Sequence, residues 1–269
     1  MTSPETAHLA KIWLYPIKSL DPIEVSSARI APSGALVGDR EFALFDQQGK
    51  YINGKNNPLV HRLRTSYDLP RRLVTMGVQG ETTSVTLHLD HQRPALVDWL
   101  SHFFGQPLEI RQNSEAGFPD DTESPASTIV SRATLEAVQT WFPDLSLEQI
   151  RLRFRSNLEI AGVPPFWEDR LYGRAGIAVP FQIGSVTFWG TNPCQRCPVP
   201  VRDPFTGENY PQFVKTFTQH RQATLPQWAE TSRFNHFYRL TVNTKVPLSE
   251  VGKTISVGDA IQLCPSQIG

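Results

Sequence analysis

Hydrophobic and polar residues alternate over several short runs in the first third of the chain. These runs cover residues 9–15, 25–30, 42–45 and 85–89, and Gly, Pro or Asp residues bound them. Period-two alternation and β-branched residues are typical of strands. The connection at residues 46–50 contains a glycine and is short enough to close a hairpin. The pattern therefore predicts a mostly antiparallel sheet structure here.

One amphipathic helix follows these strands. Gly105 and Pro107 end it. Its apolar residues are spaced to share one face: Leu96, Leu100, Phe103 and Phe104. We therefore expect the N-terminal part to be a small β-barrel with one helix.

The composition changes in the middle of the chain. Residues 112–128 are rich in Asn, Ser, Glu, Gly, Pro and Asp and show almost no apolar periodicity. Such a segment is either a linker or a long functional loop. We place a domain boundary within it, which divides the chain into residues 1–115 and residues 116–269.

The second part mixes helices with further strands. Ser131 is a candidate cap for one helix, and Ser146-Leu147-Glu148-Gln149 is a capping-box pattern that opens another. A third helix is expected around residues 213–217, and strands are expected at residues 158–161, 186–189, 237–242 and 254–263, the last one broken by Gly258-Asp259. With 22 prolines scattered through the chain, a helical bundle is disfavoured. The predicted fold class is mixed α+β and β-dominated.

The charge is balanced, with 26 Lys and Arg against 26 Asp and Glu. The chain has no net positive charge that would attract nucleic acid or an anionic membrane, so any cationic site must be a local cluster of Lys and Arg. Residues 1–11 lack the features of a signal peptide, and no apolar run approaches the about 20 residues of a spanning helix. We therefore expect a soluble, cytoplasmic protein that binds no nucleic acid and has no membrane span.

Several common catalytic motifs are missing from the sequence. It has no Gly-rich phosphate loop and no Gly-x-Ser-x-Gly elbow, so nucleotide chemistry and serine hydrolysis are unsupported. His88 and His91 have no cysteine or third histidine close by and are interpreted as solvent-facing residues. The pairs Asp120-Asp121 and Glu168-Asp169 are interpreted as solvated loop residues.

The most informative stretch is Asn192-Pro193-Cys194-Gln195-Arg196-Cys197-Pro198, which precedes Asp203-Pro204-Phe205-Thr206-Gly207. It holds two of only three cysteines, and an odd number does not make a disulfide framework. Three interpretations stay open on the residues alone. They are a zinc site completed by a distant histidine, a dithiol redox pair, and one thiolate bound to a soft metal beside anion-binding groups.

Other motifs occur in a fixed order around this stretch. They are Tyr15-Pro16-Ile17-Lys18-Ser19, Gly38-Asp39-Arg40, Phe45-Asp46, Ser131, Phe154-Arg155-Ser156-Asn157, Glu168-Asp169 and Gly258-Asp259. Together they resemble the two-domain MOSC family, an N-terminal MOSC β-barrel followed by a MOSC domain, as in the mitochondrial amidoxime-reducing component and its bacterial relatives. The resemblance runs from about Ile12 to Leu263. It implies that the second part is a MOSC-type β-barrel with peripheral helices.

The resemblance also implies a molybdenum cofactor, a pterin dithiolene with a terminal phosphate. Cys197 matches the cysteine that is the metal ligand and catalytic residue of the family, and Arg196 beside it stabilises a deprotonated thiol. Cys194 and Cys264 receive no role and are interpreted as small hydrophobic residues. The cofactor-binding donors implied by the resemblance are Lys18, Ser19, Arg40, Ser131, Arg155 and Asn157.

The activity that the resemblance implies is reduction of N-hydroxylated compounds, from N–OH to N–H plus water. A plant-type iron–sulfur cluster needs four cysteines, more than this chain has, and the chain ends at Gly269 without a fused ferredoxin domain. We therefore expect a separate flavin or iron–sulfur protein as electron donor, with no iron–sulfur cluster or pyridoxal phosphate in this chain. The alternatives are a molybdenum cofactor carrier or sulfur-transfer module without reductase activity, and a zinc-stapled binding module.

One segment departs from the family pattern. Many relatives carry two threonines after the motif cysteine, where this chain has Pro198-Val199-Pro200-Val201-Arg202. Because these hydroxyls are missing, the substrate preference of the family does not transfer. Arg202 adds a charge that would favour an anionic substrate or partner, with a solvated arginine as the alternative interpretation.

Overall fold

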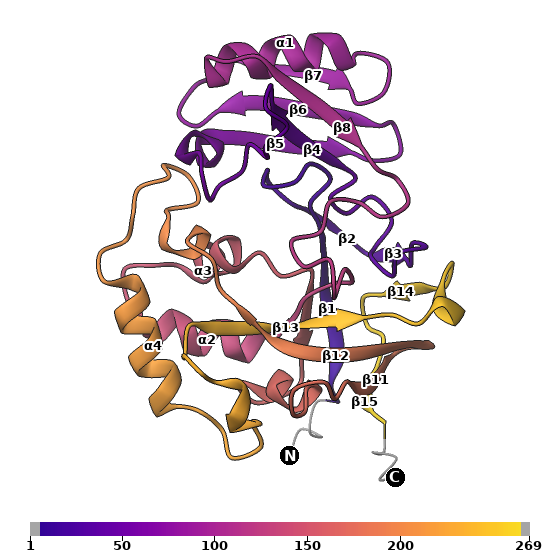
Figure 1. Ribbon diagram of the computed structural model, residues 1–269, viewed down its shortest axis with the longest axis vertical. Helices are drawn as coiled ribbons and strands as arrows, with labels where there is room; N and C mark the ends of the chain where they lie inside the picture. Colours follow the sequence, from indigo (N-terminus) through magenta and orange to yellow (C-terminus); the bar gives the residue numbers. More distant parts are fainter. Residues whose placement is uncertain (1–5, 265–269) are drawn as a thin grey trace.

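The computed structural model describes residues 6–264 and shows two parts, drawn one above the other in Figure 1. The lower part contains an eight-stranded sheet with the order β15-β11-β12-β13-β9-β10-β1-β2, in which only β9 and β10 pair in parallel. Its strands are β1 (His8–Leu14), β2 (Ile23–Val25), β9 (Ile129–Ser131), β10 (Leu158–Ala161), β11 (Val179–Ile183), β12 (Val186–Gln195), β13 (Arg239–Lys245) and β15 (Ile261–Leu263).

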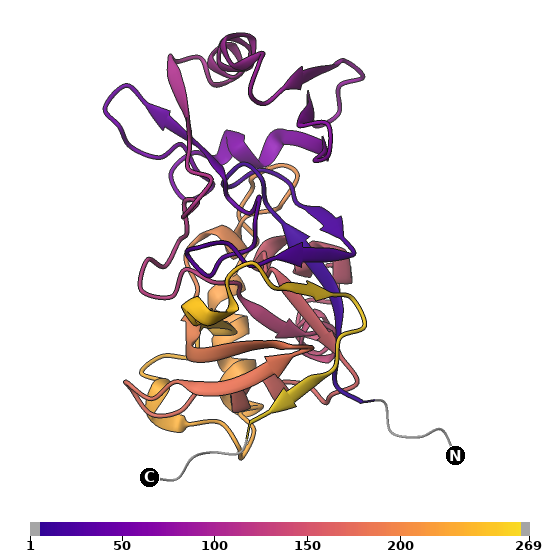
Figure 2. The same ribbon diagram turned by 90° about the vertical axis from the view of Figure 1, so that its right-hand side faces the viewer.

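The start of the chain belongs to this lower part. Ile12 of β1 lies opposite Leu158 of β10, and β3 (Ser27–Arg29) pairs with β14 (Thr254–Ser256). Figure 2 shows these first strands beside the C-terminal strands. The chain thus crosses between the two parts more than once, and the predicted domain boundary within residues 112–128 stays a prediction.

The upper part has its own hydrophobic core. It consists of the pair β4 (Phe42–Asp46) and β8 (Leu108–Gln112), the sheet β5 (Leu63–Asp68), β6 (Leu73–Val78) and β7 (Ser84–His88), and the helix α1 (Arg93–Phe104). Leu96, Leu100 and Phe104 of α1 are buried in that core, and Gly105 ends the helix at a φ of 64°. The predicted helix and its stop are confirmed.

Three helices cover the lower sheet: α2 (Arg132–Thr140), α3 (Leu147–Phe154) and α4 (Phe213–Ala223). The Ser131 hydroxyl accepts a hydrogen bond from the Thr134 amide at the start of α2, and both bonds of the predicted capping box open α3. Short 3₁₀ turns connect the strands and helices: η1 (Pro58–Arg62), η2 (Trp167–Leu171), η3 (Val199–Val201), η4 (Thr231–Arg233) and η5 (Leu248–Glu250).

These elements confirm the mixed, β-dominated fold class. Within residues 6–264, the strand order of the lower sheet ends at β2 and β15. A bridge between His8 and Ala260 and a hydrogen bond from the Ile261 amide to the Ala7 carbonyl bring β15 next to the start of β1. The strand predicted over residues 254–263 is divided at Gly258 into β14 and β15. No helix of the described residues is long and apolar enough to cross a membrane.

Candidate functional site

A cavity of about 490 Å³ lies where the upper and lower parts meet. Ten Lys and Arg residues line it, against four Asp residues, although the whole chain carries no net charge. The expectation that cationic groups form a local cluster is therefore confirmed. The cavity also collects seven of the eight predicted site residues: Lys18, Ser19, Arg40, Arg155, Asn157, Arg196 and Cys197.

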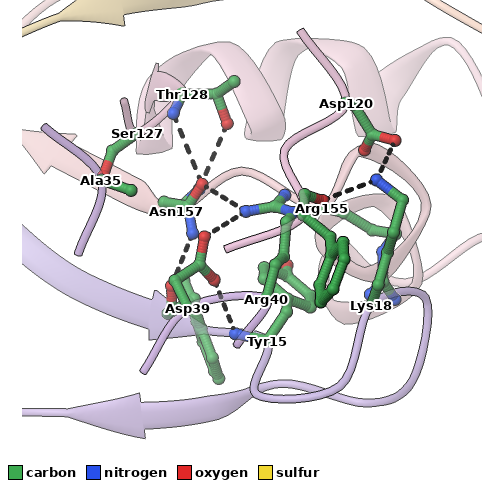
Figure 3. Close-up of polar contacts among 12 residues, drawn as sticks. Tyr15, Lys18, Ala35, Asp39, Arg40, Asp120, Ser127, Thr128, Arg155 and Asn157 are labelled. Carbon is green, nitrogen blue, oxygen red and sulfur yellow. Dashed lines mark hydrogen bonds and ion pairs between the residues drawn. The ribbon is translucent and has the colours of Figure 1, made fainter. Parts of the chain in front are cut away.

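Arg40 joins the two parts of the chain at one wall of this cavity. Its guanidinium donates to the Asp39 carboxylate and, at 3.2 Å, to the Asn157 amide oxygen (Figure 3). Asp39 in turn accepts from the Tyr15 amide at 2.8 Å, and the Asn157 side chain donates to the Trp13 carbonyl at 3.0 Å. The strand β1 and the residue directly after it, Tyr15, therefore hold both ends of the network, so Arg40 and Asn157 have fixed positions.

Lys18 lies at the same wall beneath the segment that follows β8. Its ammonium donates to the Asp120 carboxylate at 2.7 Å and to the Phe118 carbonyl at 2.8 Å (Figure 3). Burial lowers the pKa of Lys18, and the Asp120 carboxylate partly opposes that effect. Asp121 accepts from the Asn243 side chain at 2.7 Å. Asp120 and Asp121 thus line the cavity, and the Asp120 side chain is also exposed to solvent, as its interpretation as a solvated loop residue predicted.

Three of the predicted site residues adopt a left-handed backbone conformation. The φ angles are 75° at Ser19, 50° at Arg40 and 51° at Arg155. Residues other than glycine rarely adopt this conformation, which costs about 1–2 kcal/mol. Such residues concentrate at ligand and active sites, because the surrounding structure has to maintain the strain.

The cysteine motif lies at the end of β12, where the strand leaves the sheet. Arg196 donates to the Phe154 carbonyl at 2.7 Å and to the Cys194 sulfur at 3.3 Å. Burial lowers the pKa of Arg196, but the neighbouring Cys194 and Cys197 sulfurs raise it, and the net effect keeps the guanidinium charged. Both thiols line the cavity and are half-buried. Cys194 is therefore part of the site rather than a separate hydrophobic residue.

Ser131 is the predicted site residue that the structure does not bring to the cavity. Its side chain is fully buried and its hydroxyl caps α2 and donates to the Thr134 hydroxyl at 2.7 Å. The helix N-terminus is thus satisfied internally. Glu168 and Asp169 also lie away from the cavity: Glu168 accepts from Thr134 at 3.0 Å, and Asp169 pairs with the buried Arg221.

Other cavity residues were not predicted. Arg64 comes from β5, and Arg233 and Arg239 follow α4. Arg233 donates to the Thr191 carbonyl at 3.2 Å and Arg239 to the Pro193 carbonyl at 2.9 Å, so both hold the backbone that leads into the cysteine motif. In the sequence these arginines carry no signal that separates them from surface arginines.

The turn at residues 203–207, which follows the cysteine motif, packs against the upper part of the structure. The Asp203 carboxylate accepts from the amides of Phe205 and Thr206 at 2.9 and 3.0 Å. At Gly207 the φ is 79°, and an added Cβ would lie 2.6 Å from the Pro58 carbonyl oxygen of η1. This turn therefore requires glycine at that position, both for its conformation and for its close approach.

Among residues 6–264, no three His, Cys, Asp or Glu side chains converge in a way that could hold a metal ion. A zinc site needs four such ligands in most structural cases. The zinc-stapled alternative therefore has no ligand set in the described part of the chain.

Comparison with known families identifies the class of protein. Residues 6–147 match the MOSC N-terminal beta barrel domain and residues 121–262 match the MOSC domain. The chain therefore belongs to the two-domain MOSC family. The two matches overlap over residues 121–147, which begin just after the predicted domain boundary between residues 115 and 116.

Curated relatives agree with this family. The chain is 23% identical over 261 residues to the molybdenum cofactor sulfurase of Homo sapiens, covering 80% of this chain and 28% of that protein. It is 33% identical over 235 residues to the molybdenum cofactor sulfurase of Caenorhabditis briggsae, covering 79% of this chain and 31% of that protein. The chain thus spans about three tenths of the length of the curated relatives it matches.

Proposed function

We propose that the cavity binds a molybdenum cofactor and that the loaded protein reduces N-hydroxylated compounds, from N–OH to N–H plus water. One observation carries the proposal: a thiol on Cys197, a second thiol and an excess of guanidinium groups converge in one cavity. The family membership and the names of the relatives support the choice of cofactor. When bound, the cofactor would supply the two-electron chemistry of the reduction.

The residues of the cavity fit such a group. Its volume of about 490 Å³ lies within the range of small-molecule sites, about 300–1,000 Å³. Buried Nε–H groups of Arg64, Arg196, Arg202 and Arg239 have no hydrogen-bond partner among the described residues. The side chains of these arginines line the cavity, where their guanidinium groups offer donors to a ligand with several acceptor oxygens.

The proposed roles follow from the positions in the cavity. Cys197 would be the protein ligand to molybdenum, since a metal held by dithiolene sulfurs readily takes another thiolate. Arg196 favours an anionic sulfur beside it because its positive charge has no carboxylate partner within 4.0 Å among residues 6–264. The phosphate and pterin would be bound by Lys18, Ser19, Arg40 and Asn157. The Arg40 guanidinium can donate two parallel hydrogen bonds, and the Lys18 ammonium supplies a single positive charge.

Electrons would come from a separate flavin or iron–sulfur protein. The chain has three cysteines in total, fewer than a plant-type cluster requires. Electron-transfer partners usually dock through small, weak interfaces. We propose such a transient partner for this protein.

The test uses Cys197→Ser, with Cys264→Ser as the matched control. Cys264 is also half-buried but does not line the cavity. We expect wild type and the control, purified from a host that makes the cofactor, to contain molybdenum and to reduce benzamidoxime with reduced methyl viologen. Cys197→Ser should lose turnover by about 100-fold or more, comparable to the loss of one essential catalytic group. Zinc without molybdenum in the wild type, or unchanged turnover in Cys197→Ser, contradicts the proposal.

A second candidate is a sulfur-transfer or carrier module for the same cofactor. Two observations favour it: the relatives are named molybdenum cofactor sulfurases, and Cys194 lies in the cavity with Cys197. In that case Cys197 would hold a persulfide whose outer sulfur it accepts from a sulfane-sulfur donor. Molybdenum-loaded protein that turns over no N-hydroxylated substrate, but carries a labelled persulfide lost in Cys197→Ser, favours this candidate over the reductase.

A further inference from the structure

Three arginines line the cavity beside η3, the turn that directly follows Cys197. They are Arg64, Arg155 and Arg202, and we call them the guanidinium cluster. Arg64 donates to the Pro204 carbonyl at 3.0 Å, which places it against the segment that carries Arg202. His61 also lies here: a Cβ added to Gly54 would be 2.8 Å from the His61 ring and 3.5 Å from the Val199 side chain.

The guanidinium cluster carries more positive charge than its surroundings balance. Among residues 6–264, the one carboxylate within 4.0 Å of it is Asp21, at 3.5 Å from Arg64. Arg155 donates to the Leu20 carbonyl at 2.7 Å and Arg202 to the Gly207 carbonyl at 3.3 Å, both neutral acceptors. The cluster thus presents two arginine charges without a partner anion in the described part of the chain.

The pKa of His61 reflects the positive charge of the guanidinium cluster. Burial lowers the pKa of His61 to about 4, and the positive charges of Arg155, Arg202 and Arg64 contribute in the same direction. The imidazole is therefore neutral at pH 7, and its Nε2 lies 3.3 Å from the Gly54 carbonyl oxygen. Because His61 is neutral, it adds no positive charge to that of the neighbouring arginines.

The cluster is also held in place before any ligand arrives. The buried Arg153 donates to the carbonyls of Pro200, Val201 and Arg202 at 2.9, 3.1 and 2.6 Å, which fixes the backbone that bears Arg202. The Arg155 guanidinium stacks on the Tyr15 ring, 4.2 Å from its centroid. Arginines held in fixed positions lose little freedom when they bind a planar anion, so the site is preorganised.

We propose that the guanidinium cluster is a substrate-binding subsite for a carboxylate, so that the preferred substrates are N-hydroxylated compounds that carry a carboxylate group. This rests on the proposed function of the cavity. The location supports it for Arg64 and Arg202, which flank the segment after Cys197. Arg155 faces the Tyr15 ring together with Arg40, and it therefore connects the cluster to the residues proposed to bind the cofactor. The fork of a guanidinium matches a carboxylate in two parallel hydrogen bonds. Arg202 also stands in the segment that departs from the family pattern.

The kinetic test compares 4-carboxybenzamidoxime with neutral benzamidoxime on the holoprotein. The wild type should show a KM about tenfold lower for the carboxylated substrate, a typical effect of one charge-assisted pair. Arg202→Gln should remove most of that difference between the two KM values. Arg62→Gln is the matched control, because Arg62 is exposed on η1 and does not line the cavity. It should preserve the difference.

A binding test separates this inference from the proposed function. Protein labelled at its seven histidines is titrated by NMR with benzoate or benzamide, and the His61 signal is assigned by its loss in His61→Asn. Benzoate should raise the pKa of His61 because a bound anion offsets the field of the arginines, whereas benzamide should not. Arg202→Gln should weaken the effect of benzoate about tenfold.

The outcomes are distinct. If benzoate raises the pKa of His61 through Arg202 but no amidoxime is reduced, the subsite stands and the proposed reductase function fails. If benzoate leaves His61 unchanged, or if both amidoximes have the same KM, the subsite is refuted even for an active reductase. If Arg202→Gln loses molybdenum, the cluster holds the cofactor phosphate instead, which also overturns the inference.

Discussion

The buried Arg153 allows a quantitative prediction about the segment that carries the site. Its side chain is 1% exposed and donates to three consecutive carbonyls, with Asp203 at 3.5 Å as its carboxylate partner. Arg153→Met keeps most of the apolar stem and removes all of these donors. All three contacts are made by Nη1, which has two hydrogens, so they count as about two charged hydrogen bonds of about 1.5 kcal/mol each. We therefore expect a decrease of about 3 kcal/mol in the free energy of unfolding.

Arg132→Met provides the control for this measurement. Arg132 is 57% exposed and pairs with Glu136 at 2.9 Å on the surface of α2, an arrangement worth about 0.3–0.5 kcal/mol. Urea unfolding followed by tryptophan fluorescence compares both variants with wild type. If Arg153→Met costs less than about 1 kcal/mol, the bonds to these carbonyls do not stabilise this segment beyond an ordinary surface pair, and the reasoning is refuted.

Three further predictions concern other parts of the molecule. Burial, with a contribution from its neighbour Asp169, raises the pKa of Glu168 from 4.5 to about 7, so the folded protein retains this proton and its stability falls as the pH rises from about 4.5 to 7. Glu168→Gln should remove about 3 kcal/mol of that fall, measured by urea unfolding at pH 5 and pH 8; equal pH dependence in variant and wild type would speak against it. Gly207→Ala should lower the thermal unfolding temperature more than Gly80→Ala, because both positions have a positive φ but only Gly207 meets a backbone oxygen; equal shifts would mean that the close approach costs nothing. Asp120→Asn should free Lys18 and tighten the binding of inorganic phosphate several-fold in calorimetry, about 1 kcal/mol, and an unchanged affinity would show that Asp120 does not compete for the ammonium.

The local elements of this fold were largely predictable because their signals are local. Ser131, the capping box at Ser146 and the stop at Gly105 are each encoded within a few residues, and the structure has all three. The strands β5 and β6 were not predicted, since their sequences place polar residues such as Arg64 and Thr75 on half-exposed positions. Those strands exist because each finds a partner across a hairpin, Leu63 opposite Val78, rather than because of their own pattern.

The candidate site was predictable in its chemistry but only partly in its membership. Cys197, Lys18 and Arg40 could be chosen from motifs whose order in the chain matches the MOSC family, and they do meet in one cavity. Arg64 and Arg239 could not be chosen, because an isolated arginine in a sequence does not reveal whether it faces solvent or a cavity. Whether an arginine faces solvent or a cavity depends on where the fold places its backbone and not on the residue type.

The sequence by itself determined the residue types of the site and the ends of its helices. Only the tertiary structure decided which of these residues act together. Arg40 and Asn157 are 117 residues apart and meet because β1 pairs with β10. Ser131 satisfies the end of α2 instead of reaching a ligand, and Cys194 shares the cavity with Cys197. The physical reason is that caps and turns depend on neighbouring atoms along the chain, whereas a cavity depends on strand pairing between distant segments.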